Sequence, residues 1–139
     1  MAPLSVTEPV GVPIATLADV EHVRREARAL AHAHGVRNVD AERLVLAVSE
    51  LATNLLRYAR DGEIVLTATA GATYIGLQVE SRDRGPGIPD VARAMQDGFS
   101  TGGGLGNGLP AVRRLLDAFD ITSGPKGTRI TGRLCLNVP

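Results

Sequence analysis

The chain has 139 residues and a mass of 14.6 kDa, the size of one ordinary domain. Fifteen basic residues balance fifteen acidic ones, which argues against a nucleic-acid binder, because such proteins need a basic surface. A single cysteine excludes an intrachain disulfide, and no apolar run in the sequence is long enough to span a membrane. The N-terminal residues lack the basic start and apolar stretch of a signal peptide, so we expect none. We therefore expect a cytoplasmic protein with one domain over residues 10–139, preceded by a flexible tail at residues 1–9.

The first predicted elements are an edge strand and a helix. Residues 10–14 favour a strand, and Pro13 would confine that strand to the edge of a sheet. Apolar residues at helical spacing predict a helix over residues 17–34. Gly35 is expected to end this helix as its C-terminal cap.

A second helix is predicted over residues 41–58. Asp40 is a plausible N-cap for it, and the preceding Val39 could act as a hydrophobic staple. Asp61 and the glycine after it would close the segment.

The rest of the chain is predicted to form a hairpin, further helices and two final strands. In chain order, we expect strands at 63–70 and 73–81, a short helix at 89–96, a glycine-rich loop at 98–108, a helix at 109–118, and strands at 119–123 and 128–138. Because hairpins outnumber crossovers, the expected class is α+β, a two-layer α/β sandwich. Its sheet would be mostly antiparallel, with the helices on one face.

One stripe of the second predicted helix is polar. At about 100° per residue, Arg43, Glu50, Asn54 and Arg57 fall on one narrow strip, and most of the remaining positions are apolar. Glu50 and Asn54 lie one turn apart. A carboxylate and an amide so placed could handle a hard cation and an attacking group together. The alternative is a solvated helix face with an incidental acid and amide, and this helix alone favours that alternative.

A short loop with an acid and two glycines follows the predicted hairpin. Asp83 offers two acceptor oxygens, which could take a hydrogen bond from an exocyclic amine such as that of adenine. Gly85 and Gly87 would let the backbone approach a flat ring closely. An ordinary turn rich in Asp, Gly and Pro is the alternative, and the loop alone favours it.

The third pattern is the glycine-rich run at residues 102–109, which leads into a helix. Successive glycines leave backbone N–H groups free to converge on an anion, and the helix N-terminus adds partial positive charge. The run therefore predicts a phosphate cradle rather than a flexible linker. It is not a P-loop, because no Gly-Lys-Ser/Thr follows, and it does not sit in an early β-α-β unit as a dinucleotide-binding motif would.

These three patterns occur in one order, with Glu-x-x-x-Asn on a helix, Asp-x-Gly-x-Gly after a strand and Gly-x-Gly-x-Gly opening a helix. In that order the chain resembles the GHKL ATP-binding fold, which histidine kinases, gyrase, Hsp90 and MutL share. The stretches at residues 49–54, 83–89, 96–101 and 103–110 resemble the small RsbT-type serine/threonine switch kinases. The resemblance covers nearly the whole chain.

The resemblance implies a role for each motif residue. Asn54 would bind Mg²⁺, and Glu50 would act as the general base on the acceptor hydroxyl. Asp83 would bind the adenine amine, supported by Thr128 and a water. The other implied contacts are Gly85 and Gly87 beside the base, Gly104, Leu105, Gly106 and Gly108 around the phosphates, and a short lid at residues 98–103.

The resemblance also implies an activity and partners. A kinase of this type would use ATP and Mg²⁺ to phosphorylate a STAS-domain protein in a partner-switching or stressosome pathway that regulates a sigma factor. The free kinase would activate a PP2C-type phosphatase, and no nucleic acid or membrane partner is expected.

Two alternatives stay open: an anti-sigma factor that sequesters a sigma subunit, and a nucleotide-dependent binding module without transfer activity. Residues 99–104 and Leu109-Pro110 look like the RsbT branch, and Glu50 argues against a pure binding module.

No cation for the γ-phosphate is evident in the glycine-rich loop. Residues 98–108 carry no Lys or Arg. Arg57, Arg60 and Arg113 are candidates from outside the loop, but for each of them a solvated surface arginine is the favoured alternative.

Overall fold

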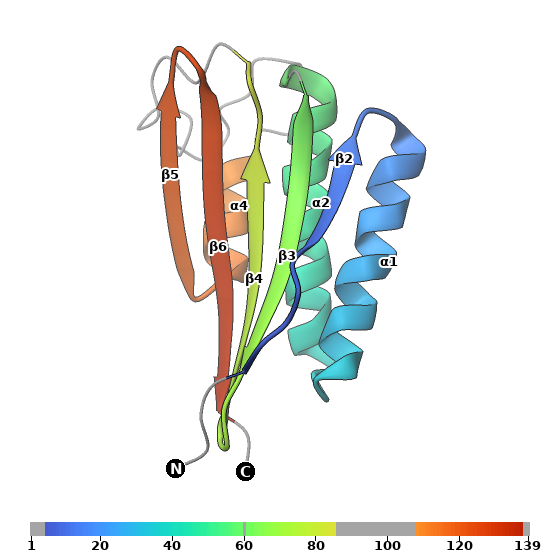
Figure 1. Cartoon of the computed structure of the whole chain (residues 1–139), viewed down its shortest axis with the longest axis vertical. Helices are drawn as coiled ribbons and strands as arrows, with labels where there is room; N and C mark the ends of the chain where they lie inside the picture. Colours follow the sequence, from blue (N-terminus) through green and yellow to red (C-terminus); the bar gives the residue numbers. More distant parts are fainter. Residues whose placement is uncertain (1–4, 60, 86–107, 138–139) are drawn as a thin grey trace.

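A computed structural model of the chain describes residues 5–59, 61–85 and 108–137 (Figure 1). The elements are β1 (Ser5–Val6), β2 (Val10–Ile14), α1 (Leu17–Ala33), α2 (Asn38–Tyr58), β3 (Gly62–Ala70), β4 (Tyr74–Arg82), α4 (Gly108–Leu115), β5 (Ala118–Gly124) and β6 (Gly127–Asn137). The helix predicted at 89–96 and all but the last residue of the glycine-rich loop lie outside the described residues.

The strands of the described part of the chain form one six-stranded sheet, and every pairing in it is antiparallel. The order is β1-β3-β4-β6-β5, and β2 pairs with the same strand as β1, namely β3. Pro13 therefore lies on an edge strand, as predicted, because an edge tolerates a residue without an N–H group. The predicted α+β class with a mostly antiparallel sheet is confirmed.

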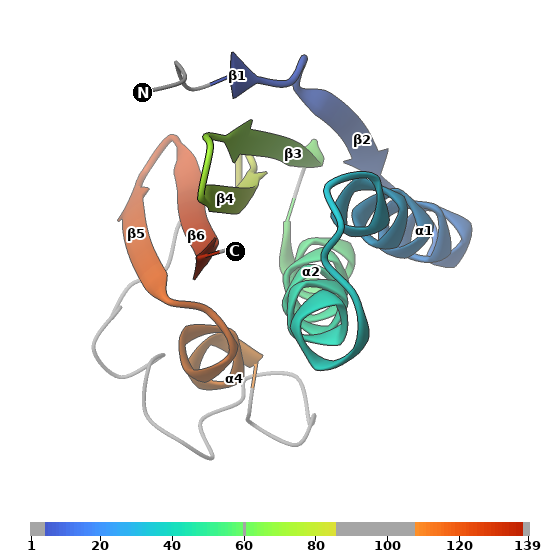
Figure 2. The ribbon, with the colours of Figure 1, turned by 90° about the horizontal axis from the view of Figure 1, so that it is seen from below.

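Helices cover one face of this sheet. Figure 2 shows α1, α2 and α4 on the same side of the curved strands. Buried side chains alternate along β3 and β4 because successive residues of a strand point to opposite faces. The buried residues of the two long helices recur at helical spacing and meet those of the strands in one apolar core. None of the helices in the described ranges is long and apolar enough to cross a membrane.

Residues 5–7 pair with the sheet, although the sequence predicts a flexible tail over residues 1–9. Ser5 and Val6 pair with the far end of β3. The Thr7 N–H group donates to the Ala68 carbonyl oxygen at 2.9 Å, and the Thr7 hydroxyl accepts from the Ala68 N–H group at 3.0 Å. Backbone pairing of this kind does not require an apolar sequence, so composition could not reveal it.

The predicted start of the second helix is wrong by three residues. Helix α2 begins at Asn38, and Arg37 in the cap position makes no side-chain cap hydrogen bond. Asn38 has φ 57°, a left-handed conformation that Asn tolerates, and the chain turns into the helix there. Asp40 consequently lies in the first turn, where a carboxylate is favourable. Val39 is 73% exposed and does not act as a staple.

Helix α1 is closed at both ends by its own neighbours in sequence. The Thr16 hydroxyl accepts from the Asp19 N–H group at 3.2 Å, and the Asp19 carboxylate accepts from the Thr16 N–H group at 3.0 Å. At the other end Gly35 has φ 77°, and its N–H group donates to the His32 carbonyl. Val36 then donates to the Ala31 carbonyl, which completes a Schellman motif. The predicted C-terminal role of Gly35 is confirmed.

Candidate functional site

The end of β4 and the start of β6 meet very closely at one end of the sheet. The Asp83 N–H group donates to the Thr128 carbonyl oxygen at 3.1 Å. Gly127 has φ 136°, and a Cβ atom at this position would overlap the Asp83 carbonyl. Only glycine satisfies both conditions without strain. The structure thus brings Asp83 and Thr128 together, and Gly127 makes the approach possible.

The Asp83 carboxylate is held by its own loop. Its Oδ1 atom accepts a hydrogen bond from the Gly85 N–H group at 2.7 Å, and Gly85 is buried. A carboxylate has a second acceptor oxygen, here Oδ2, of the type that accepts a hydrogen bond from an amine. Gly87 follows outside the described residues.

Thr128 is held from the neighbouring strand. It is only 8% exposed, and its hydroxyl lies 2.8 Å from the Ser123 hydroxyl. Ser123 and Thr128 are directly opposite each other in the register of β5 and β6. The sequence reasoning missed Ser123. The available signal was the turn between the two strands, which places these residues opposite each other.

Helix α2 brings the other half of the candidate site. Glu50 is exposed and Asn54, one turn later, is half-buried. A Cβ atom on Gly108 would lie 3.2 Å from Asn54 Nδ2 and 3.3 Å from Asn54 Oδ1. Gly108 therefore lets the start of α4 approach the amide closely. The first N–H groups of a helix lack internal partners, so this junction suits an anionic ligand.

These groups lie at the same end of the molecule. In Figure 1 the ends of β4 and α2 and the beginning of β6 are all at the top. Gly108 lies close to the Asn54 amide there, and Asp83 is hydrogen-bonded to Thr128. The other residues predicted around the phosphates, Gly104, Leu105 and Gly106, and the predicted lid at 98–103 lie outside the described residues.

The described residues fit a nucleotide with one bound Mg²⁺. Mg²⁺ prefers oxygen ligands and usually keeps several waters, so the amide oxygen of Asn54 suffices as a side-chain ligand. The space beside that amide, which a side chain on Gly108 would fill, suits a closely approaching phosphate. The acceptor oxygen of Asp83 suits an exocyclic amine.

The predicted cations for the γ-phosphate remain predictions. Arg57 on α2 and Arg113 on α4 are both exposed, and Arg60 lies outside the described residues.

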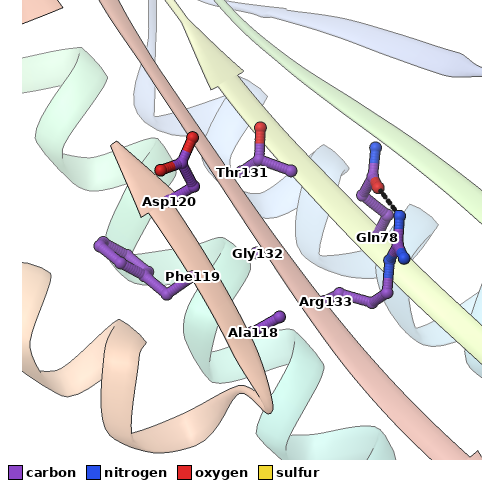
Figure 3. Close-up of a pocket in the computed structure, with 7 residues that line it drawn as sticks. All are labelled: Gln78, Ala118, Phe119, Asp120, Thr131, Gly132 and Arg133. Carbon is purple, nitrogen blue, oxygen red and sulfur yellow. Dashed lines mark hydrogen bonds between the residues drawn. The ribbon is translucent and has the colours of Figure 1, made fainter. Parts of the chain in front are cut away.

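A separate hollow of about 190 Å³ lies on the face of the sheet away from the helices (Figure 3). Its lining comes from the three strands β4, β5 and β6 and consists of Gln78, Ala118, Phe119, Asp120, Thr131, Gly132 and Arg133. The Arg133 guanidinium donates to the side chain of its strand partner Gln78 at 2.7 Å, at the β4 side of this hollow (Figure 3). Among the described residues, none of those predicted to bind nucleotide lines the hollow, which sets it apart from the described part of the candidate site.

Comparison with known proteins identifies relatives along nearly the whole chain. Residues 14–134 match the family model described as the histidine kinase-like ATPase domain. The chain is 44% identical over 120 residues to the serine/threonine-protein kinase RsbT of Bacillus subtilis, covering 86% of this chain and 90% of that protein. It is 34% identical over 89 residues to an anti-sigma F factor of Caldanaerobacter subterraneus, covering 60% and 62% respectively.

Solved structures share the fold at lower identity. The structure of the RsbU and RsbW domains of Rv1364c from Mycobacterium tuberculosis matches with a TM-score of 0.67 and 23% identity, over 96% of this chain and 33% of that one. The mycobacterial sensor histidine kinase MprB matches with a TM-score of 0.54 and 20% identity, over 95% and 98%. At these identities the likeness establishes the fold.

Proposed function

Because this chain belongs to the family of histidine kinase-like ATPase domains and is a serine/threonine kinase of the RsbT type, we propose that it phosphorylates a STAS-domain protein with ATP and Mg²⁺. The observation that carries the proposal is the close approach of the start of α4, at Gly108, to the Asn54 amide, one helical turn from Glu50. It supports the proposal because the Asn54 amide lies close to the start of α4, and Glu50 lies one turn before Asn54 on the same helix.

Bound ATP and Mg²⁺ supply the γ-phosphoryl group and the charge that neutralises it during transfer. Asn54 would hold the metal through its amide oxygen. Asp83 would accept a hydrogen bond from the adenine amine, with Thr128 and a water in support. Gly85 and Gly87 would line the base, and Gly104, Leu105, Gly106 and Gly108 would surround the phosphates.

Glu50 would serve as the general base. Its carboxylate is exposed, so the hydroxyl of a protein substrate can reach it. As the serine or threonine oxygen forms its bond to the γ-phosphorus, the hydroxyl proton passes to Glu50. The bond from that phosphorus to the bridging oxygen breaks, and ADP leaves.

We place this reaction in the cytoplasm, in a partner-switching or stressosome pathway that regulates a sigma factor. Release of the kinase from its phosphorylated partner would free it to activate a PP2C-type phosphatase. Support comes from two relatives of this chain, one named a serine/threonine-protein kinase and the other an anti-sigma factor.

A transfer assay with γ-³²P-labelled ATP, Mg²⁺ and a STAS-domain protein from the same genome tests the proposal. We expect label on serine or threonine of the STAS protein. Glu50→Gln should slow transfer about 100-fold or more, because it removes the base. Glu42→Gln is the matched control, since Glu42 is an exposed carboxylate on the same helix. Full transfer by Glu50→Gln would overturn the assigned role.

The anti-sigma alternative rests on the 34% identity to an anti-sigma F factor. A pull-down with this chain as bait, with and without Mg-ATP, separates the two functions. Retention of a sigma subunit and of no STAS protein would favour sequestration. ATP that binds but is never consumed, even with the retained proteins present, would favour a binding module.

A further inference from the structure

Arg43 plays no part in the proposed transfer, although it lies on the same polar stripe of α2 as Asn54. Eleven positions separate the two residues, which is roughly three helical turns, so they project from nearly the same face. The Arg43 Nε atom donates to the Leu115 carbonyl oxygen at 2.9 Å. Leu115 is the last residue of α4, and Gly108, its first residue, lies close to the Asn54 amide. One face of α2 therefore holds both ends of α4.

The same guanidinium also reaches the chain beyond α4. Arg43 Nη2 lies 3.3 Å from Asp117 Oδ1. The other oxygen of Asp117 accepts from the Cys135 N–H group on β6 at 2.7 Å. A positive charge at a helix C-terminus is favourable, and the planar guanidinium can serve the carbonyl and the carboxylate together. Arg43 is 29% exposed, so solvent screens these contacts only in part.

The orientation of helix α4 in the fold depends on polar contacts such as those of Arg43. It has eight residues, too few for a helix to be stable in isolation. Its buried residues Leu109, Pro110 and Val112 fix which side faces the core. Apolar contacts are not directional, whereas the hydrogen bond from Arg43 fixes the position of the last carbonyl.

We propose that Arg43 is a positioning residue for the nucleotide site. By fixing the C-terminal end of α4, it sets how the N-terminal end of α4 meets Asn54, and so sets the affinity for Mg-ATP. This inference rests on the proposed function, because it assumes that phosphates bind where Gly108 meets Asn54.

The test compares Arg43→Gln with Arg28→Gln. Arg28 pairs with Glu42 at 3.2 Å and joins α1 to α2, and its contacts do not include α4. We expect Arg43→Gln to weaken Mg-ATP binding about tenfold, as measured by calorimetry. A change of this size corresponds to part of the free energy of a charge-assisted hydrogen bond. In the absence of nucleotide, amide hydrogen exchange in α4 should be faster in Arg43→Gln than in the wild-type protein. Arg28→Gln should change neither measurement.

Two further variants separate positioning from general stability. Val23→Ala removes buried volume from α1, and it should lower the melting temperature while leaving the affinity for Mg-ATP unchanged. Arg43→Lys should recover only part of the affinity, because an ammonium cannot reproduce the planar fork. Equal loss of affinity in Val23→Ala and Arg43→Gln would show a merely structural role and overturn the inference.

The remaining outcomes separate the inference from its premise. If the wild-type protein binds Mg-ATP and Arg43→Gln binds it equally well, only the inference fails. If the wild-type protein does not bind Mg-ATP, the proposed function fails and the inference fails with it.

Discussion

Helices α1 and α4 both pack on α2, but they are held there in different ways. Helix α1 has seventeen residues, and the groups that close its two ends are neighbours in sequence. Helix α4 has eight residues, and both of its ends meet side chains of α2 that lie more than fifty positions away in sequence. The first helix is therefore specified locally and the second by the assembled fold.

This difference distinguishes the structural scaffold, to which α1 belongs, from the candidate site, which α4 borders. A locally specified helix can form early and keeps its geometry when distant residues change. A helix specified by long-range polar contacts can be moved by one substitution far from its own sequence. We therefore expect substitutions near α1 to change stability alone, and those near α4 and the adjoining strand ends to change nucleotide affinity as well.

The largest expected effect concerns the core that both helices share. Leu44 on α2 is fully buried, and Leu44→Ala should lower the free energy of unfolding by about 2–5 kcal/mol. Urea denaturation measures this change. Leu46→Ala is the matched control, because Leu46 lies two residues on, is 50% exposed, and should cost about 0.5 kcal/mol or less. Equal costs for the two variants would contradict the observed burial of α2.

The next effect falls on the site. Gly127→Ala forces a side chain into a φ of 136° and against the Asp83 carbonyl. The free energy of unfolding should fall by about 1–3 kcal/mol. The affinity for Mg-ATP should fall too, because Asp83 is displaced. Calorimetry and urea denaturation measure the two quantities.

Gly124→Ala is the control for this change, since Gly124 is paired with Gly127 across the same turn and a Cβ atom there meets nothing within 4 Å. If the two alanine variants behaved alike, the close approach of β4 and β6 would not matter for binding.

The elements that the sequence predicts well are those with local signals. The helical spacing of α1, Gly35 at its end and the alternation along β3 and β4 all depend on residues close in sequence. The start of α2 was predicted wrongly because Asp40 is a good N-cap by type, whereas the left-handed Asn38 turns the chain earlier.

The polar contacts around the candidate site are harder to predict. Arg43 reaches the Leu115 carbonyl 72 positions away, and no spacing rule links the two. Gly127 is recognisable as a turn residue, but its contact with Asp83 depends on how β4 and β6 lie together. The resemblance of the motifs predicts which residues would bind nucleotide, but the sequence does not indicate which residues hold them in place.

A smaller effect is expected at the start of α1. Thr16→Ala removes the side-chain acceptor of the N-cap and should lower the free energy of unfolding by about 0.5–2 kcal/mol. The affinity for Mg-ATP should stay unchanged, because the cap is local to α1. Thermal unfolding and calorimetry on one preparation test both statements. A loss of affinity that matched the loss of stability would contradict the separation of scaffold and site.

The smallest effect is a pH dependence at the same cap. The backbone N–H group of Ala15 donates to the Asp19 carboxylate and, with the Thr16 contacts, lowers the pKa of that group below its ordinary value of 3.8. A lowered pKa means that the ionised form stabilises the folded state. This contribution is fully present above the ordinary value and is lost as the pH falls through the pKa of the folded state. Asp19→Asn should therefore be less stable than the wild-type protein at pH 7, and the difference should shrink towards pH 3. Melting temperatures measured across this range test the sign, and a difference that grew on acidification would contradict the capping role of the ionised carboxylate.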